Sequence, residues 1–234
     1  YVSPRHLSVG SDGLICICPS DKADFRMRMF NADASEGMMC GNGSRCIAKF
    51  VYDKGLTQKN PITLETLSGI KTIAMDVADG KVVSATVDMG VPITDPSSIP
   101  MTWEKSICLD ETITVTVDGA PLSLRGTGVS MGNPHFVTFV EDVATAPVEK
   151  VGRVIEHSSY FPERVNVEFV EIVDDNHVKF RVWERGSGET LACGTGACAV
   201  AYTAITLGKA GRRDQFLTVE AVGGPLQLNY RSDG

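Results

Sequence analysis

Two segments of the chain alternate apolar and basic residues with the period of a half-buried strand. They are Phe25–Phe30 and Val178–Trp183. Each segment runs into a loop of small and polar residues, 31–39 in the first case and 184–192 in the second. Each loop ends at a cysteine followed by glycine, in the motifs C-G-N-G at 40–43 and C-G-T-G at 193–196. The pattern predicts a strand, a loop and a tight turn, twice.

Both cysteine motifs open a helical pattern. The first predicted helix, Ser44–Lys54, has apolar Ile47, Phe50 and Val51 on one face and a stop signal at Gly55. The second, Ala197–Leu207, is apolar almost all round and ends before Gly208. A helix that is apolar on every side is expected to be buried on every side.

The two copies continue in register beyond the helices. A strand and turn follow each one, at Leu64–Gly69 and Val219–Gly224. Glu36 and Glu189 both lie four residues before their cysteines. The same elements in the same order twice indicate an internal duplication.

The rest of the chain is mostly strand and turn. Asp79-Gly80 and Asp118-Gly119 predict hairpins within 77–89 and 112–124, and further strands are expected at 136–140 and 165–173. Pro92, Pro96 and Pro100 cluster with small polar residues and predict a linker. We therefore divide the chain into an N-terminal half, 1–92, and a C-terminal half, 93–234.

Composition narrows the class of protein. The 234 residues are 43% hydrophobic and 22% charged, with a net charge of −7 and no block of like charge, which argues against nucleic acid or an anionic membrane as partner. No apolar run reaches the roughly 18 residues that span a bilayer, and no signal peptide is recognised at the start.

The seven cysteines are an odd number for a disulfide framework, so we expect reduced thiols in the cytoplasm. Five of them are expected to be small buried hydrophobes or helix core residues: Cys16, Cys18, Cys108, Cys46 and Cys198.

The remaining two, Cys40 and Cys193, sit where chemistry is expected. A cysteine at a helix N-terminus meets the positive end of the helix dipole and free backbone N–H groups, which favour thiolate over thiol. The same N–H groups can bind a substrate carboxylate. Two such thiols from a duplication suit inversion of a stereocentre, since one removes a proton from one face and the other adds a proton to the opposite face. No cofactor or metal motif is present in the sequence, so none is expected.

At these residues the chain resembles diaminopimelate epimerases over nearly its whole length. The resemblance is carried by the segments 30–33, 39–46, 130–135, 162–166, 184–190 and 192–197. It implies an α+β fold of two pseudo-symmetric halves, each a sheet wrapped around a central helix, with the active site in the cleft between them. It also implies interconversion of LL- and meso-diaminopimelate, for lysine and peptidoglycan synthesis, without a cofactor, and a homodimer.

The resemblance also implies residue roles. Cys193 accepts the proton from the LL isomer while Cys40 donates one, and the roles reverse in the other direction. The reacting carboxylate is held at the N-termini of the two helices by Gly41, Asn42, Gly194 and Thr195. The distal amino-acid end of the substrate is bound by a further set: Asn31, Asn133, Asn166, Glu184 and Arg185. For the three asparagines the alternative role is local turn formation. For Glu184 and Arg185 the alternative is an ion pair between them. His135 is expected to give structural support.

The chain departs from the family pattern in three places. The opening strand with its substrate-binding asparagine and the closing segment have no counterpart, so the first half is expected to lack a strand. The family's N-A-D-G-S turn reads Asn31 to Ser35 with alanine at 34. Three other functions stay open: a racemase of another amino acid, such as proline, on the same fold; a redox sensor that pairs Cys40 with Cys193; and a non-catalytic binding relic.

Overall fold

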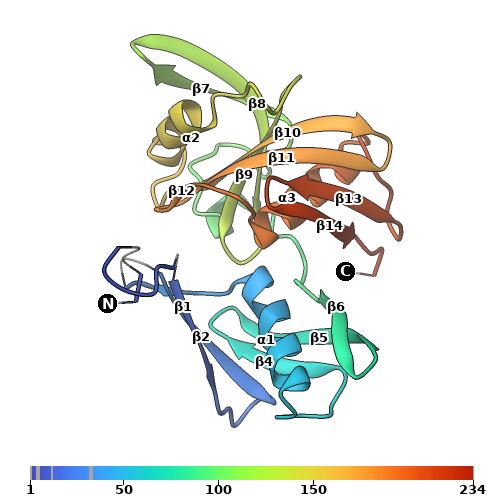
Figure 1. The fold of residues 1–234 in the computed structure, drawn as a ribbon. Helices are drawn as coiled ribbons and strands as arrows, with labels where there is room; N and C mark the ends of the chain where they lie inside the picture. The colour runs from blue at the N-terminus through green and yellow to red at the C-terminus, as the bar shows by residue number, and fades with distance from the viewer. Residues whose placement is uncertain (1, 4–5, 12, 32–33, 234) are drawn as a thin grey trace. The chain divides into compact units, whose positions relative to one another are not determined.

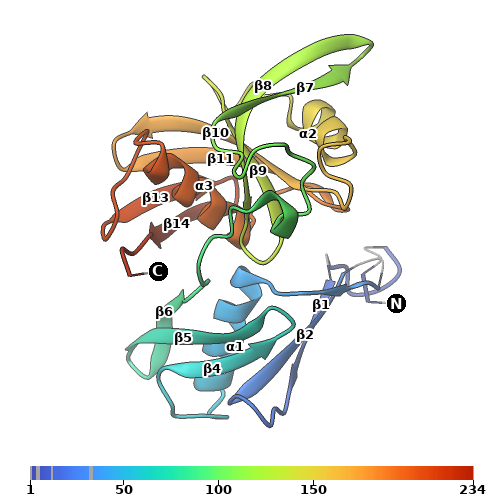
Figure 2. The ribbon, with the colours of Figure 1, turned by 180° about the vertical axis from the view of Figure 1, so that it is seen from behind.

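The computed structural model describes residues 2–3, 6–11, 13–31 and 34–233. These residues form two compact units, Tyr1–Met89 and Gly90–Gly234. Each unit is a β-sheet packed on a central helix, which confirms the expected α+β class (Figures 1 and 2). Ala32 and Asp33, within the predicted turn from Asn31 to Ser35, lie outside the described residues.

The first unit places helix α1 against β5 and β6. Its sheet runs in the order β1-β2-β4-β5-β6, and β3 pairs with β2. The core between helix and sheet includes Met27, Ile47, Val51, Leu64 and Ile73. Its elements are β1 Gly13–Cys18, β2 Phe25–Asn31, β3 Glu36–Gly37, α1 Gly41–Asp53, β4 Ile62–Thr66, β5 Gly69–Ala78 and β6 Lys81–Val87.

The second unit has a longer sheet in the order β14-β13-β11-β10-β9-β8-β7, and β12 pairs with β11. Helix α3 packs against β8 to β11, β13 and β14, while α2 packs against β7, β10, β11 and β12. The elements are a 3₁₀ turn Pro96–Ser98, β7 Glu111–Val117, β8 Ala120–Ser130, β9 Pro134–Phe139, α2 Val148–Glu156, β10 Asn166–Asp174, β11 His177–Glu184, β12 Gly188–Thr190, α3 Gly194–Thr206, β13 Phe216–Ala221 and β14 Gly224–Asn229.

The duplication is visible in strand pairing. In the first unit β1 and β2 are antiparallel, β2 and β4 parallel, and β4 and β5 antiparallel. In the second unit β10, β11, β13 and β14 repeat these three pairings in the same order. Ile15 pairs with Met29 in one unit, and Glu168 pairs with Val182 in the other, so Glu168 occupies the position of Ile15.

The two helices differ as the sequence predicts, apart from one residue. Helix α3 is buried along nearly all its length. Helix α1 buries Ile47, Ala48 and Val51, but Phe50 is 48% exposed, so its predicted place on the buried face is wrong. Gly55 and Gly208 follow the helix ends with φ of +71° and +64°, a left-handed conformation that glycine adopts at no steric cost.

The proline-containing segment predicted as a linker packs on the second unit. Ile93 exchanges two backbone hydrogen bonds with Ser130, of 2.9 and 2.8 Å. Pro96 begins the 3₁₀ turn, and Ile99 and Met101 join the core beside α2. Helix α2 is absent from the sequence-based expectations. No helix in the described ranges is long and apolar enough to cross a membrane.

The five cysteines expected in the core do not all lie there. Cys108 is fully buried, as predicted. Cys46 is exposed on α1, so its assignment to the core is wrong. Cys16, Cys18 and Cys198 are only partly buried.

Candidate active site

Cys40 caps the N-terminus of α1 with its own sulfur. Its backbone is extended, with φ −134° and ψ 112°, and Sγ accepts a hydrogen bond from the Gly43 N–H at 3.3 Å. The Cys40 carbonyl accepts the Ser44 N–H at 2.8 Å, which begins the helix. A side chain on Gly43 would collide with Ile15, because an added Cβ would lie 2.5 Å from Ile15 Cδ1. The glycine therefore lets strand β1 approach the cysteine turn.

Cys193 repeats this geometry at α3. Its φ is −125° and ψ is 115°, and Sγ accepts the Gly196 N–H at 3.3 Å. The Cys193 carbonyl accepts the Ala197 N–H at 2.9 Å. The same sulfur also lies 3.4 Å from Thr195 Oγ1. Each cysteine is therefore an N-cap, and the helices begin three residues earlier than the sequence pattern suggests.

Each cysteine loop is braced by an arginine on the preceding strand. Arg28 on β2 forms two hydrogen bonds with Glu36, of 2.8 and 3.1 Å, and Arg181 on β11 forms two with Glu189, of 2.7 and 3.0 Å. Paired N–H···O contacts of this kind fix orientation as well as distance. The glutamates noted four residues before the cysteines thus hold both loops in the same way.

The surroundings of Cys193 oppose the ionisation that the helix N-terminus favours. The residue is 6% exposed, and burial raises the pKa of its thiol well above the usual range. The negative charges of Glu184 and Glu168 raise this pKa further, while hydrogen bonds from the Thr195 hydroxyl and the Gly196 N–H lower it by a smaller amount. The helix N-terminus therefore acts on this sulfur, but burial has the larger effect.

A buried acid–imidazole pair lies beside this turn. His135 on β9 and Glu168 on β10 are both fully buried, with Nδ1 and Oε1 2.6 Å apart. His135 Nε2 faces Asn133 Oδ1 at 3.1 Å. Both ring nitrogens therefore face oxygen, and His135 joins Asn133 to Glu168. These contacts are consistent with the structural support expected of His135, and its role stays a prediction.

The predicted substrate-binding residues of the first unit lie at the two ends of its cysteine loop. Asn31 ends β2, and its side-chain amide donates to Ser35 Oγ at 3.0 Å. Gly41 and Asn42 form the first turn of α1, where Asn42 Oδ1 accepts from Arg45 at 2.7 Å. Gly41 and Asn42 directly follow Cys40, and contact of all three residues with substrate stays a prediction.

In the second unit, Asn166 and Glu184 lie near Arg185 and the cysteine loop. Asn166 is 4% exposed and joins two strands, because its Nδ2 donates to the Pro134 carbonyl at 2.9 Å and its Oδ1 accepts the Arg185 N–H at 2.8 Å. Glu184 hydrogen-bonds to Thr190, and burial raises its pKa. Arg185 donates to the Glu163 carbonyl at 3.2 Å.

Two buried glutamates were missed by sequence reasoning. Glu156 on α2 accepts from Trp183 Nε1 at 2.6 Å and from the Gly186 N–H at 3.0 Å, so it supports the loop that carries Glu184 and Arg185. Glu168 is the other. A carboxylate between apolar Val167 and Phe169 in the buried first part of β10 was the signal that could have identified it.

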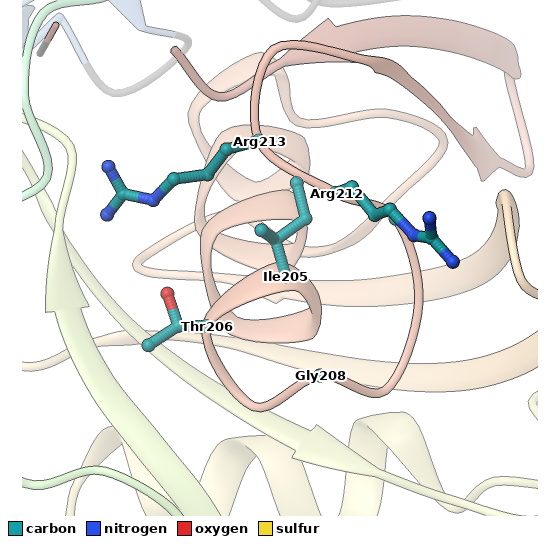
Figure 3. Close-up of a pocket in the computed structure, with 6 residues that line it drawn as sticks. Ile205, Thr206, Gly208, Arg212 and Arg213 are labelled. Atoms are coloured by element: carbon teal, nitrogen blue, oxygen red, sulfur yellow. The ribbon is translucent and has the colours of Figure 1, made fainter. Parts of the chain in front are cut away.

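A hollow of about 540 Å³ lies elsewhere, at the C-terminal end of α3. Figure 3 shows Arg212 and Arg213 on its rim, extending away from each other, so they do not converge on one ligand. Arg213 stacks on Tyr230, with its guanidinium 4.1 Å from the ring centre. Within the described ranges no cluster of three or more His, Cys, Asp or Glu residues could hold a metal.

Solved structures with a similar fold include two amino-acid racemases. A probable proline racemase from Agrobacterium radiobacter K84 matches with TM-score 0.72 and 17% identity, covering 96% of this chain and 68% of that one. A hydroxyproline epimerase from Agrobacterium vitis matches with TM-score 0.69 and 17% identity, covering 96% and 67%. At this identity the likeness establishes the fold alone.

Sequence relatives are much closer. Diaminopimelate epimerase of Methanococcus maripaludis strain C5 is 52% identical over 230 residues, which cover 98% of this chain and 80% of the relative. That of Bacillus licheniformis is 48% identical over 233 residues, covering 100% and 80%. The model of the family described as diaminopimelate epimerase matches residues 1–94 and 127–234. The chain therefore belongs to the diaminopimelate epimerase family.

Proposed function

We propose that the chain interconverts LL- and meso-2,6-diaminopimelate, with Cys40 and Cys193 as the acid and base on opposite faces of one α-carbon. Membership of the family and the names of its relatives support the activity. The observation that carries the assignment of the thiols is the matched geometry of the two cysteine turns, each with Sγ 3.3 Å from the third backbone N–H of its own helix.

The two sulfurs alone account for the proton that is removed and the proton that is added. In one direction the Cys193 thiolate takes the α-proton, forming an S–H bond and leaving the C–H electron pair on carbon. The Cys40 thiol then gives its proton to the opposite face and becomes the thiolate. Reversal of the two roles carries the product back, so no oxidant, reductant or cofactor is consumed.

The carbanion needs electrostatic stabilisation at the substrate carboxylate. The first turns of α1 and α3, through Gly41, Asn42, Gly194 and Thr195, present backbone N–H groups and the positive ends of two helix dipoles. Charge that develops on the carboxylate during proton removal is stabilised there more in the transition state than in the ground state. We assign these four residues to the reacting carboxylate.

The distal end of diaminopimelate carries a second ammonium and a second carboxylate. We assign Arg185 to that carboxylate, because a guanidinium binds both oxygens at once. Glu184 and the side-chain oxygens of Asn31, Asn133 and Asn166 are assigned to that ammonium. Proline has no second amino-acid head, so this set favours diaminopimelate over the substrates named for the structural neighbours.

Cysteine replacement tests the proposal. Cys40→Ala and Cys193→Ala should each lower LL-diaminopimelate turnover by at least about a thousandfold, the upper part of the range for loss of an acid or base. Cys46→Ala and Cys198→Ala are matched controls, one on each helix, and should keep parental turnover. Full activity in Cys193→Ala, or faster turnover of proline than of diaminopimelate by the parent, would contradict the proposal.

Two further assignments belong to the same proposal. The reaction needs reduced sulfur, and none of the seven cysteines, all of which lie in the described ranges, forms a disulfide; we propose that the protein acts in a reducing cytoplasm. We also propose a homodimer, from the family resemblance. Light scattering in reducing buffer should give twice the chain mass; the monomer mass would refute it.

A further inference from the structure

The duplication offers an internal comparison for every residue near the cysteines. Ile15 and Glu168 occupy the same position on corresponding strands, since their cross-strand partners are Met29 and Val182. Both side chains point at the glycine of the cysteine turn. A Cβ on Gly43 would lie 2.5 Å from Ile15 Cδ1, and one on Gly196 would lie 2.7 Å from Glu168 Oε1. One turn therefore faces a hydrocarbon, and the other faces a carboxylate.

Glu168 lies within electrostatic range of the Cys193 sulfur. The same added Cβ would lie 3.2 Å from Cys193 Sγ, so the carboxylate oxygen and the sulfur are at most about 6 Å apart (2.7 Å plus 3.2 Å). Both groups are shielded from bulk solvent, because Glu168 is fully buried and Cys193 is 6% exposed. A charge at this range in a dry site strongly affects ionisation of its neighbour.

Packing alone does not account for a carboxylate at this position. Glu168 Oε2 is buried and has no hydrogen-bond partner among the described residues. An unsatisfied buried carboxylate oxygen is costly to folding, and the first unit fills the same position with isoleucine. Oε1 is paired with His135 on β9, a strand with no counterpart among the described strands of the first unit.

We propose that Glu168 is a positioning residue that increases the difference between the two thiols: with His135 held against it, its carboxylate acts together with burial and Glu184 to keep Cys193 the second of the pair to lose its proton. This rests on the proposed function, which needs one thiol and one thiolate at a time. The titratable groups facing Cys193 are Glu168 from β10, Glu184 from β11 and, through Glu168, His135 from β9. Ile15 supplies no such charge to Cys40.

The alkaline limb of the kcat/KM profile should report the second thiol to ionise, because activity is lost once both are thiolates. Glu168→Gln removes the charge and keeps a hydrogen-bonding group for His135, so this limb should move to lower pH by one unit or more. Glu168→Asp keeps the charge but moves it away from both His135 and the cysteine turn, so the limb should move in the same direction by a smaller amount. Both profiles are measured with LL-diaminopimelate.

Glu171→Gln is the matched control, since it removes a carboxylate from the opposite face of the same strand and leaves an acceptor for the Val143 N–H. Its profile should equal that of the parent. The proposal is overturned if Glu168→Gln lowers only the melting temperature, or if Glu171→Gln moves the limb equally. If Glu168→Gln does not fold, an unchanged alkaline limb in Glu168→Asp overturns it. An inactive parent would instead refute the proposed function.

Discussion

The acidity of Cys193 should depend on Glu184, the last residue of β11. The negative charge of Glu184 is the largest cause of the raised pKa of Cys193 after burial. Glu184→Gln removes this charge and keeps the size of the side chain and an acceptor for Thr190. We therefore expect the pKa of the Cys193 thiol to fall in this variant.

The direction and limit of the effect follow from the causes of the raised pKa. The charge of Glu184 is removed in the variant while burial, the largest cause, persists, so the pKa of Cys193 should fall only part of the way toward its usual range. Burial raises the pKa of Glu184 itself, so its charge, and the effect of removing it, is most complete at alkaline pH.

Alkylation by iodoacetamide across a pH series measures this acidity without substrate. Mass spectrometry of the peptide containing Cys193 gives the pH midpoint of its reaction. Cys108 is an internal control, because burial raises its pKa to about 11 and Glu184 is not among the causes. Glu189→Gln is the matched variant, since this carboxylate lies in the same loop but pairs with Arg181.

The midpoint for Cys193 should fall in Glu184→Gln alone, with that of Cys108 unchanged. A midpoint that stays or rises would show that Glu184 is not charged beside the thiol. An equal fall in Glu189→Gln would show that the loop has opened, not that a charge has been removed. Either result would refute the electrostatic account of Cys193.

Three further results are expected. Ala34→Gly should raise the free energy of unfolding by about 1 kcal/mol in chemical denaturation, because Ala34 has a φ of +70°; an unchanged midpoint would speak against strain there. Asp24→Asn should lower the free energy of unfolding by about 1 kcal/mol at pH 7, since Asp24 pairs with Lys59. That pairing lowers the folded-state pKa of Asp24 below 3.8, so the difference from the parent should disappear as the pH falls below about 4; a constant difference down to pH 2 would refute it. Gly43→Ala and Gly196→Ala should each cut kcat at least tenfold, because the new methyl lies 3.4 and 3.2 Å from the cysteine sulfur and much closer to the facing strand; parental rates would show that the turns tolerate a side chain.

The duplicated core of the fold could be predicted from sequence because its signals are local. Alternating strands, the two cysteine turns and the glycine stops are each encoded within a few residues, and all lie where the pattern predicts. Helix α2 was missed because it is nine residues long, begins at Val148 after a proline and lacks a side-chain cap. The local sequence favours this helix only marginally, and packing on β10 and β11 stabilises it.

The sequence predicts the two cysteines of the candidate site, but it does not predict which groups control their ionisation. The helix N-terminus, visible in sequence, favours a thiolate at Cys193. The opposing groups come from other strands, Glu168 from β10 and Glu184 from β11, and only the folded sheet brings them to the sulfur. Phe50 and Cys46 were misplaced for a related reason, since α1 is covered by strands on one narrow face only.

Isotope incorporation during the first turnovers in D₂O tests the central claim most directly. With two thiols on opposite faces, the thiol that protonates the product carries solvent deuterium. Newly formed meso-diaminopimelate should then hold deuterium at the inverted carbon, while unreacted LL substrate keeps its protium. Product that retains the substrate's own hydrogen at that carbon would mean that one base serves both faces, and would contradict the assignment of Cys40 and Cys193.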